Sequence, residues 1–152
     1  MLNRRAFLTN AAIAAPALLL MSRPALASTP RVFAVDGLAI RGTDPVSYFT
    51  QGGPVAGSST HEIVWGDATW RFASEENMER FMGDVHSHAP QFGGYCAFAM
   101  SRGEITTTDP HAWTIVDGKL YLNYSLPVRT VWSEDIAGNI ALANGHWPNI
   151  LR

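Results

Sequence analysis

The chain has 152 residues, of which 11 are Lys or Arg and 13 are Asp or Glu, so its net charge is −2 with neutral histidines. Its single cysteine excludes an internal disulfide, and the absence of a basic run disfavours nucleic acid as a partner. Folding must therefore depend on an apolar core, which five Trp, seven Phe and four Tyr side chains can supply.

The first 27 residues have the order of an export signal. Adjacent arginines, Arg4 and Arg5, precede an alanine-rich apolar run over 11–21 and a small-residue end at Ala27. This order predicts a twin-arginine signal peptide that is cleaved after Ala27, and a periplasmic location for the domain over 28–152. The alternative, an uncleaved membrane anchor, is disfavoured because the run is shorter than the roughly 20 residues of a span and contains Pro16. Three basic and no acidic residues would leave with the signal, so the exported chain would carry a net charge of −5.

The region before residue 60 predicts only short elements. A first strand is expected over 32–35, followed by a turn and connection over 36–42. Thr43 or Asp44 before Pro45 is typical of a helix start, so a short helix to Phe49 is expected. A loop rich in Gly, Pro and Ser then separates this helix from the next strand.

The middle of the chain predicts a hairpin and a helix. Two aromatic-rich runs, 61–65 and 68–72, are separated by a Gly-Asp turn, which is typical of a β-hairpin. Ser74 is a good N-cap, and two glutamates follow it where the helix dipole favours negative charge. Apolar residues at helical spacing continue this helix to about Asp84.

The last third of the chain predicts a second hairpin and a final helix. The runs 113–116 and 120–124 alternate around Asp117-Gly118, one of the stronger hairpin signals. A single helix is expected from Pro127 to about Asn144. The whole chain therefore predicts a small α+β domain of β-hairpins packed against short helices.

One cluster of soft ligands is the candidate for chemistry, since the common signatures of hydrolases and nucleotide-binding proteins are absent from the sequence. Cys96 and Met100 are four residues apart, which on a helical turn places both sulfurs on one face, and His86 and His88 lie just upstream. Thiolate, thioether and imidazole together suit copper(I), while thiolate and imidazole would also accept zinc.

Other interpretations of the same residues stay open. Cys96 can be a buried, inert thiol, and the Gly93-Gly94 turn can mark a close approach to a ligand in a metal-free binding module. Alternatively, Cys96 can be the nucleophile of a redox enzyme, activated by His88 or His111. No second cysteine is present to resolve an oxidised thiol within the chain, which disfavours that enzyme.

Several segments carry a resemblance to a known family. They are "DPVSYF", "VWGDATWRFASEENMERF", "PQFGGYCAFAM", "WTIVDGKLYLNY" and "VWSEDIAGNIALANGHWP". In this order they resemble the YHS-domain family, and in particular its exported members with a Gly-Gly-Tyr-Cys-Ala segment. The resemblance implies a small α+β, treble-clef-like unit. Members that bind metals do so through cysteines at positions that here hold Ser47, Ala73 and Asn77, so the resemblance does not imply their type of metal site.

The sequence therefore predicts an exported, non-enzymatic YHS-domain protein that binds a soft metal, copper rather than zinc, through Cys96. Met100, His88 and His86 would assist Cys96. The expected partners are a metal-donor or metal-acceptor protein and, for the precursor, the twin-arginine export machinery, with no stable membrane anchor after cleavage. A metal-free module that binds a small molecule or a protein is the alternative, and a thiol-based redox enzyme is the third hypothesis.

Overall fold

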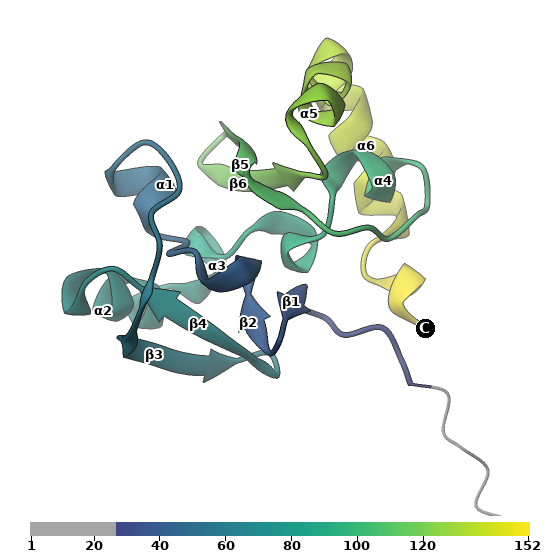
Figure 1. The fold of residues 1–152 in the computed structure, drawn as a ribbon. Helices are drawn as coiled ribbons and strands as arrows, with labels where there is room; N and C mark the ends of the chain where they lie inside the picture. Colours follow the sequence, from purple (N-terminus) through teal and green to yellow (C-terminus); the bar gives the residue numbers. More distant parts are fainter. Residues whose placement is uncertain (1–26) are drawn as a thin grey trace, which may run out of the picture.

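The computed structural model describes residues 27–152, which form a single small α+β domain, as expected (Figure 1). The predicted signal peptide lies outside the described residues except for its last residue, Ala27. The strands are β1 (Ala34–Val35), β2 (Leu38–Ala39), β3 (Ser58–Trp65), β4 (Ala68–Phe72), β5 (Asp109–Val116) and β6 (Lys119–Asn123). The α-helices are α1 (Ser47–Thr50), α2 (Glu75–Gly83), α3 (Val85–His88), α4 (Ala97–Ser101), α5 (Leu126–Trp132) and α6 (Ile136–His146). Single 3₁₀ turns are η1 (Ile40–Gly42), η2 (Gln91–Gly94), η3 (Ser133–Asp135) and η4 (Asn149–Leu151).

The first sheet has the strand order β1-β2-β4-β3 and contains the first predicted hairpin. Strands β3 and β4 pair antiparallel around Gly66 and Asp67, which both have positive φ, while β2 pairs with β4 in parallel. The predicted first strand over 32–35 is shorter in the structure, because Phe33 donates its backbone N–H to the Gly93 carbonyl (2.9 Å) and not to a strand. This bond ties the start of the domain to η2.

Helix α2 begins where the sequence predicts. The Ser74 side chain accepts the backbone N–H of Asn77, and Glu75 and Glu76 occupy the first turn, where the helix dipole favours negative charge. Phe81 is fully buried and contacts the aromatic rings of β4, so α2 packs on the first sheet. A single residue, Asp84, then separates α2 from α3.

The second sheet is the other predicted hairpin, β5 and β6, which pair antiparallel around Asp117-Gly118. The single helix predicted over 127–144 is wrong, because the chain forms α5, η3 and α6. Asp135 leaves the helical conformation (φ −145°, ψ 74°), and its side chain accepts the N–H of Gly138, which caps a new helix. Apolar spacing alone does not reveal such a break.

Two apolar cores form, one on each face of β6. The first core contains Trp70, Phe72, Phe81, Tyr48, Leu120 and Leu122. The second core contains Phe92, Tyr95, Met100, Tyr121, Trp132 and Ala143. Because side chains alternate along a strand, Leu120 and Leu122 face the first core while Tyr121 faces the second.

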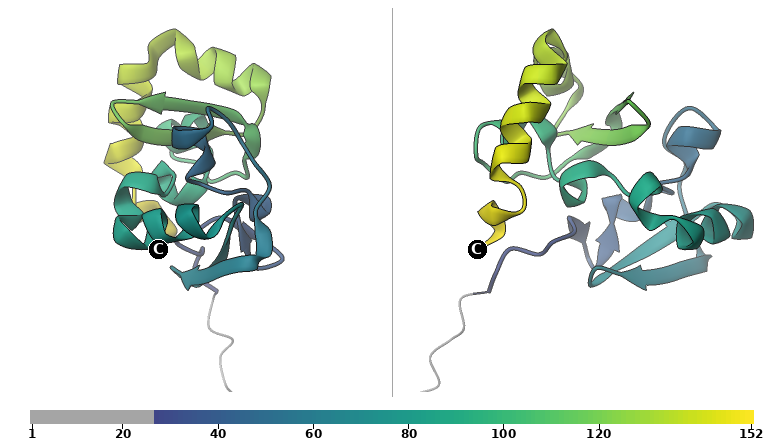
Figure 2. Two further views of the ribbon diagram at one scale, coloured as in Figure 1. Left: turned by 90° about the vertical axis from the view of Figure 1, so that its left-hand side faces the viewer. Right: turned by 180° about the vertical axis from the view of Figure 1, so that it is seen from behind.

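The two ends of the described chain lie on the same side of the domain, with η4 near the segment that leads into β1 (Figure 2). Within residues 27–152, no helix has both the length and the apolar character needed to cross a membrane.

Candidate functional site: an aromatic cleft between two cores

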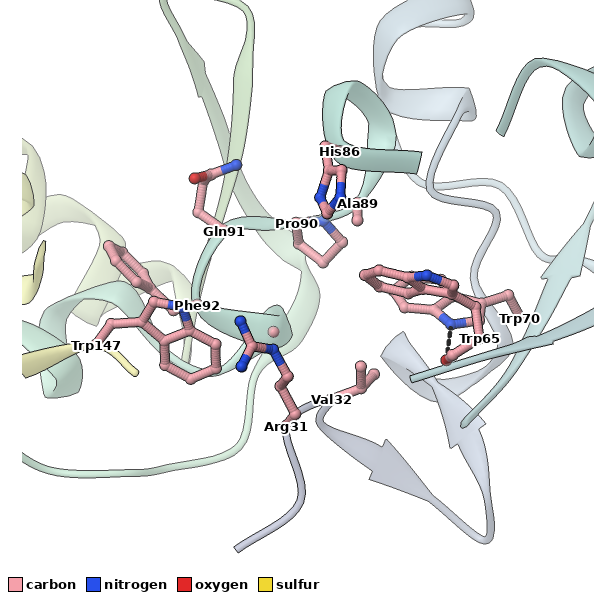
Figure 3. Close-up of a pocket in the computed structure, with 11 residues that line it drawn as sticks. Arg31, Val32, Trp65, Trp70, His86, Ala89, Pro90, Gln91, Phe92 and Trp147 are labelled. Carbon is pink, nitrogen blue, oxygen red and sulfur yellow. Dashed lines mark hydrogen bonds between the residues drawn. The ribbon is translucent and has the colours of Figure 1, made fainter. Parts of the chain in front are cut away.

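A cleft of about 170 Å³ opens where the two cores meet (Figure 3). Val32, Trp70 and Ala89 reach it from the first core, and Phe92 reaches it from the second. The remaining lining residues are Arg31, Trp65, His86, Pro90, Gln91, Gly93 and Trp147. The lining thus brings together segments from both ends of the described chain and from its middle.

One wall of the cleft is built on the first hairpin and α3. The Trp65 and Trp70 rings have centroids 5.9 Å apart, and the Trp70 indole N–H donates to the Trp65 carbonyl at 2.9 Å. The His86 ring stands edge-on to Trp65, with centroids 6.0 Å apart (Figure 3). Trp70 is buried and Trp65 half-buried, so Trp65 presents part of its ring to the cleft.

The opposite wall is built on η2 and the end of α6. Phe92 and Trp147 meet edge-on with centroids 6.2 Å apart, and the Arg31 guanidinium lies 5.9 Å from the centroid of Trp147. Phe92 and Gly93 both have positive φ (56° and 63°), an uncommon conformation for phenylalanine. A side chain at position 93 would meet the Arg31 carbonyl, so glycine is required there because another backbone segment passes close by.

Helix α3 holds its two histidines in different surroundings. His86 lines the cleft, whereas His88 donates its Nδ1–H to the Asp84 carbonyl (2.8 Å) and stands edge-on to Phe49. Asp84 caps the helix by accepting both the hydroxyl and the N–H of Ser87, and these hydrogen bonds lower the pKa of its carboxyl below the ordinary value. His88 therefore contacts the α1 region and does not line the cleft.

Cys96 is buried and serves as the N-cap of α4. Its Sγ accepts the backbone N–H of Ala99 (3.5 Å) and of Tyr124 (3.3 Å), and it lies 3.6 Å from the Asn123 Oδ1. Two backbone donors that would otherwise lack a partner are thus satisfied by one sulfur. This role as a capping side chain is one that sequence reasoning did not consider.

The four predicted metal ligands lie on two helices, His86 and His88 on α3 and Cys96 and Met100 at α4. Met100 is fully buried in the second core, and Cys96 lines a hollow with Arg102 and Glu104 that does not include His86. No group of three His, Cys, Asp or Glu side chains that could hold a metal ion occurs within residues 27–152. The structure therefore does not gather His86, His88 and Cys96 into one such group, and copper binding through Cys96 stays a prediction.

Three positions, Ser47, Ala73 and Asn77, were compared above with cysteines of metal-binding YHS domains. They come together around buried Asp44. Asp44 has no exposed surface, and it accepts the Val46 N–H (2.8 Å), the Ala73 N–H (2.9 Å) and the Asn77 side-chain amide (2.7 Å). The Ser47 hydroxyl donates to the Asp44 carbonyl at 2.7 Å. A hydrogen-bonded aspartate therefore joins these three positions.

Comparison with protein families, with characterised proteins and with solved structures finds no match. The resemblance to YHS domains therefore remains a prediction from the quoted segments.

Sequence reasoning missed most of the cleft. It treated the tryptophans as core residues and did not single out Arg31 or Gln91, although the Gly93-Gly94 turn and the density of aromatic residues were visible signals. The arrangement depends on contacts between residues as far apart as Arg31 and Trp147, which no local pattern reveals.

Proposed function

We propose that the protein is a binding module that holds a small, flat organic molecule in the aromatic cleft without using a metal. The observation that carries the proposal is the cleft itself, with indole rings from Trp65 and Trp147 on opposite walls. Flat apolar rings offer stacking and edge contacts worth about 0.5–1.5 kcal/mol each beyond the burial of area. A cleft with apolar walls and few polar groups is a common form of ligand site.

Binding, and not turnover, is the function that this lining favours. The lining residues within 27–152 include no carboxylate, thiol or hydroxyl side chain, so the cleft offers no side-chain nucleophile of those types. Cys96, the thiol of the redox hypothesis, is buried and lines a different hollow. The proposed function is thus the metal-free binding module, the alternative that the sequence leaves open.

The first test is a titration of the purified protein with indole, followed by the indole N–H signals of its tryptophans in NMR spectra. We expect saturable shifts at Trp65 and Trp147, because their rings line the cleft. Trp113 is the internal control, since it packs against Tyr48 away from the cleft.

A matched pair of variants completes this test. Trp65→Leu removes one wall, and we expect indole affinity to fall about 3- to 10-fold, whereas Trp113→Leu leaves it unchanged. Shifts of equal size at all tryptophans, or no saturation, would show that the cleft does not bind flat rings.

A further inference from the structure

Resting on the proposed function, we infer that the ligand of the cleft carries an anionic group beside its ring, and that Arg31 binds this group. The chemical class is a small aromatic or heteroaromatic oxyanion, such as a carboxylate. The inference comes from the charge and placement of the groups that line the cleft.

The cleft is positively charged in a chain with more acidic than basic residues. Arg31 and His86 are the only ionisable side chains among its lining residues, and the lining includes no Asp or Glu. The ion pairs within residues 27–152 join Arg71 to Glu62, Arg80 to Glu76 and His111 to Asp109. The guanidinium of Arg31 thus has no carboxylate partner in the described chain, which leaves it available to an anionic ligand.

Four of the other described arginines have hydrogen-bond partners for their side chains. Arg41 donates to the Thr108 carbonyl, Arg129 to the Thr114 hydroxyl, and Arg71 and Arg80 to glutamates. Arg41 and Arg102 also lie over aromatic rings, those of Phe33 and Phe98. The hollow beside Arg41 contains Asp109, and the hollow beside Arg102 contains Glu104. Arg31 therefore differs from these ring-stacked arginines, because the cleft that it lines has no carboxylate in its lining.

The backbone on either side of Arg31 is fixed in place although its side chain is exposed. The Tyr95 hydroxyl donates to the Pro30 carbonyl (2.8 Å), and Phe33 donates to the Gly93 carbonyl (2.9 Å). Figure 3 shows the guanidinium between the Trp147 ring and the opposite wall, directed into the cleft. A planar guanidinium held in this way suits a carboxylate, which it binds through two parallel N–H donors.

The test compares three probes that share one ring: indole-3-acetate, its neutral amide, and the cationic tryptamine. We expect the acetate to bind about 10-fold or more tightly than the amide, and tryptamine to bind most weakly. In Arg31→Gln, the acetate should lose this advantage while the amide keeps its wild-type affinity. Arg102→Gln removes the same charge from another ring-stacked arginine and should change neither affinity.

Three results would overturn the inference. Equal affinities for acetate and amide would remove the anionic preference while leaving the proposed function intact. Equal losses of acetate and amide affinity in Arg31→Gln would make Arg31 a part of the wall and not the anion partner. Failure of all three probes to bind would instead reject the proposed function itself.

Discussion

At the scale of single residues, Cys96 shows how a side chain that suggests chemistry can have a structural role. Its sulfur accepts two backbone N–H groups, one from its own helix and one from Tyr124, which is 28 residues away in sequence. A buried N–H without an acceptor costs about 1–3 kcal/mol, so the sulfur contributes to stability independently of any metal. The thiol therefore links α4 to the end of β6.

We expect Cys96→Ala to lower the free energy of unfolding by about 2–3 kcal/mol, because both the Ala99 and the Tyr124 N–H groups lose their acceptor. Cys96→Ser should cost less, since a hydroxyl is also an N-cap acceptor. Urea unfolding measures both changes.

Ser74→Ala is the matched control for this prediction. Ser74 caps α2 through one N–H, that of Asn77, so its loss should cost only about 1 kcal/mol. An unchanged stability of Cys96→Ala would contradict the capping role.

The two Cys96 variants also test the copper prediction. That prediction requires that the wild type takes up copper(I) under anaerobic conditions and that both Cys96 variants lose this uptake.

At the scale of elements, the left-handed turn η2 positions the wall of the cleft that contains Phe92, Trp147 and Arg31. Its residues Phe92, Gly93 and Gly94 all have positive φ, which turns the chain so that Phe92 meets Trp147. The turn also brings the Gly93 carbonyl to the N–H of Phe33, which sets the path of the backbone at Arg31. Strained backbone is often found at binding sites, where the surrounding contacts stabilise it.

Gly93→Ala should cost about 1–3 kcal/mol more than Gly52→Ala. Both glycines have positive φ, so both substitutions strain the backbone by about 1–2 kcal/mol. At position 93 the added methyl group also meets the Arg31 carbonyl, whereas at position 52 it meets nothing within 4 Å. Thermal unfolding of the two variants measures the difference, and equal losses would mean that the close approach of Arg31 is unimportant.

At the scale of the whole molecule, β6 contributes side chains to both cores and so joins them. Its alternating side chains enter the first core at Leu120 and Leu122 and the second at Tyr121. If either core unfolds, the side chains on one face of β6 become exposed to solvent. A domain of this size is expected to unfold in one cooperative transition.

We expect Leu122→Ala to destabilise both cores together. Removing this buried side chain from the first core should cost about 2–5 kcal/mol. The indole N–H signals of Trp70, in the first core, and Trp132, in the second, should then disappear at one lowered urea concentration. Loss of the Trp70 signal alone, with Trp132 unchanged, would show that the cores unfold independently.

The sequence alone predicted the features that depend on neighbouring residues. Gly66-Asp67 and Asp117-Gly118 mark hairpin turns, and Ser74 marks the start of α2, because turn and cap conformations depend on residues a few positions apart. The break between α5 and α6 was missed, since the capping role of Asp135 is hidden within an apolar pattern that continues across it.

Tertiary structure alone decided the cleft, the two cores and the role of Cys96. Arg31 meets Trp147, and Cys96 meets Tyr124, only after strands and helices pack. Such contacts depend on how distant segments are placed in space, and no local spacing in the chain encodes that placement. The α+β class therefore follows from local patterns, whereas the candidate site follows from packing between segments that are far apart in sequence.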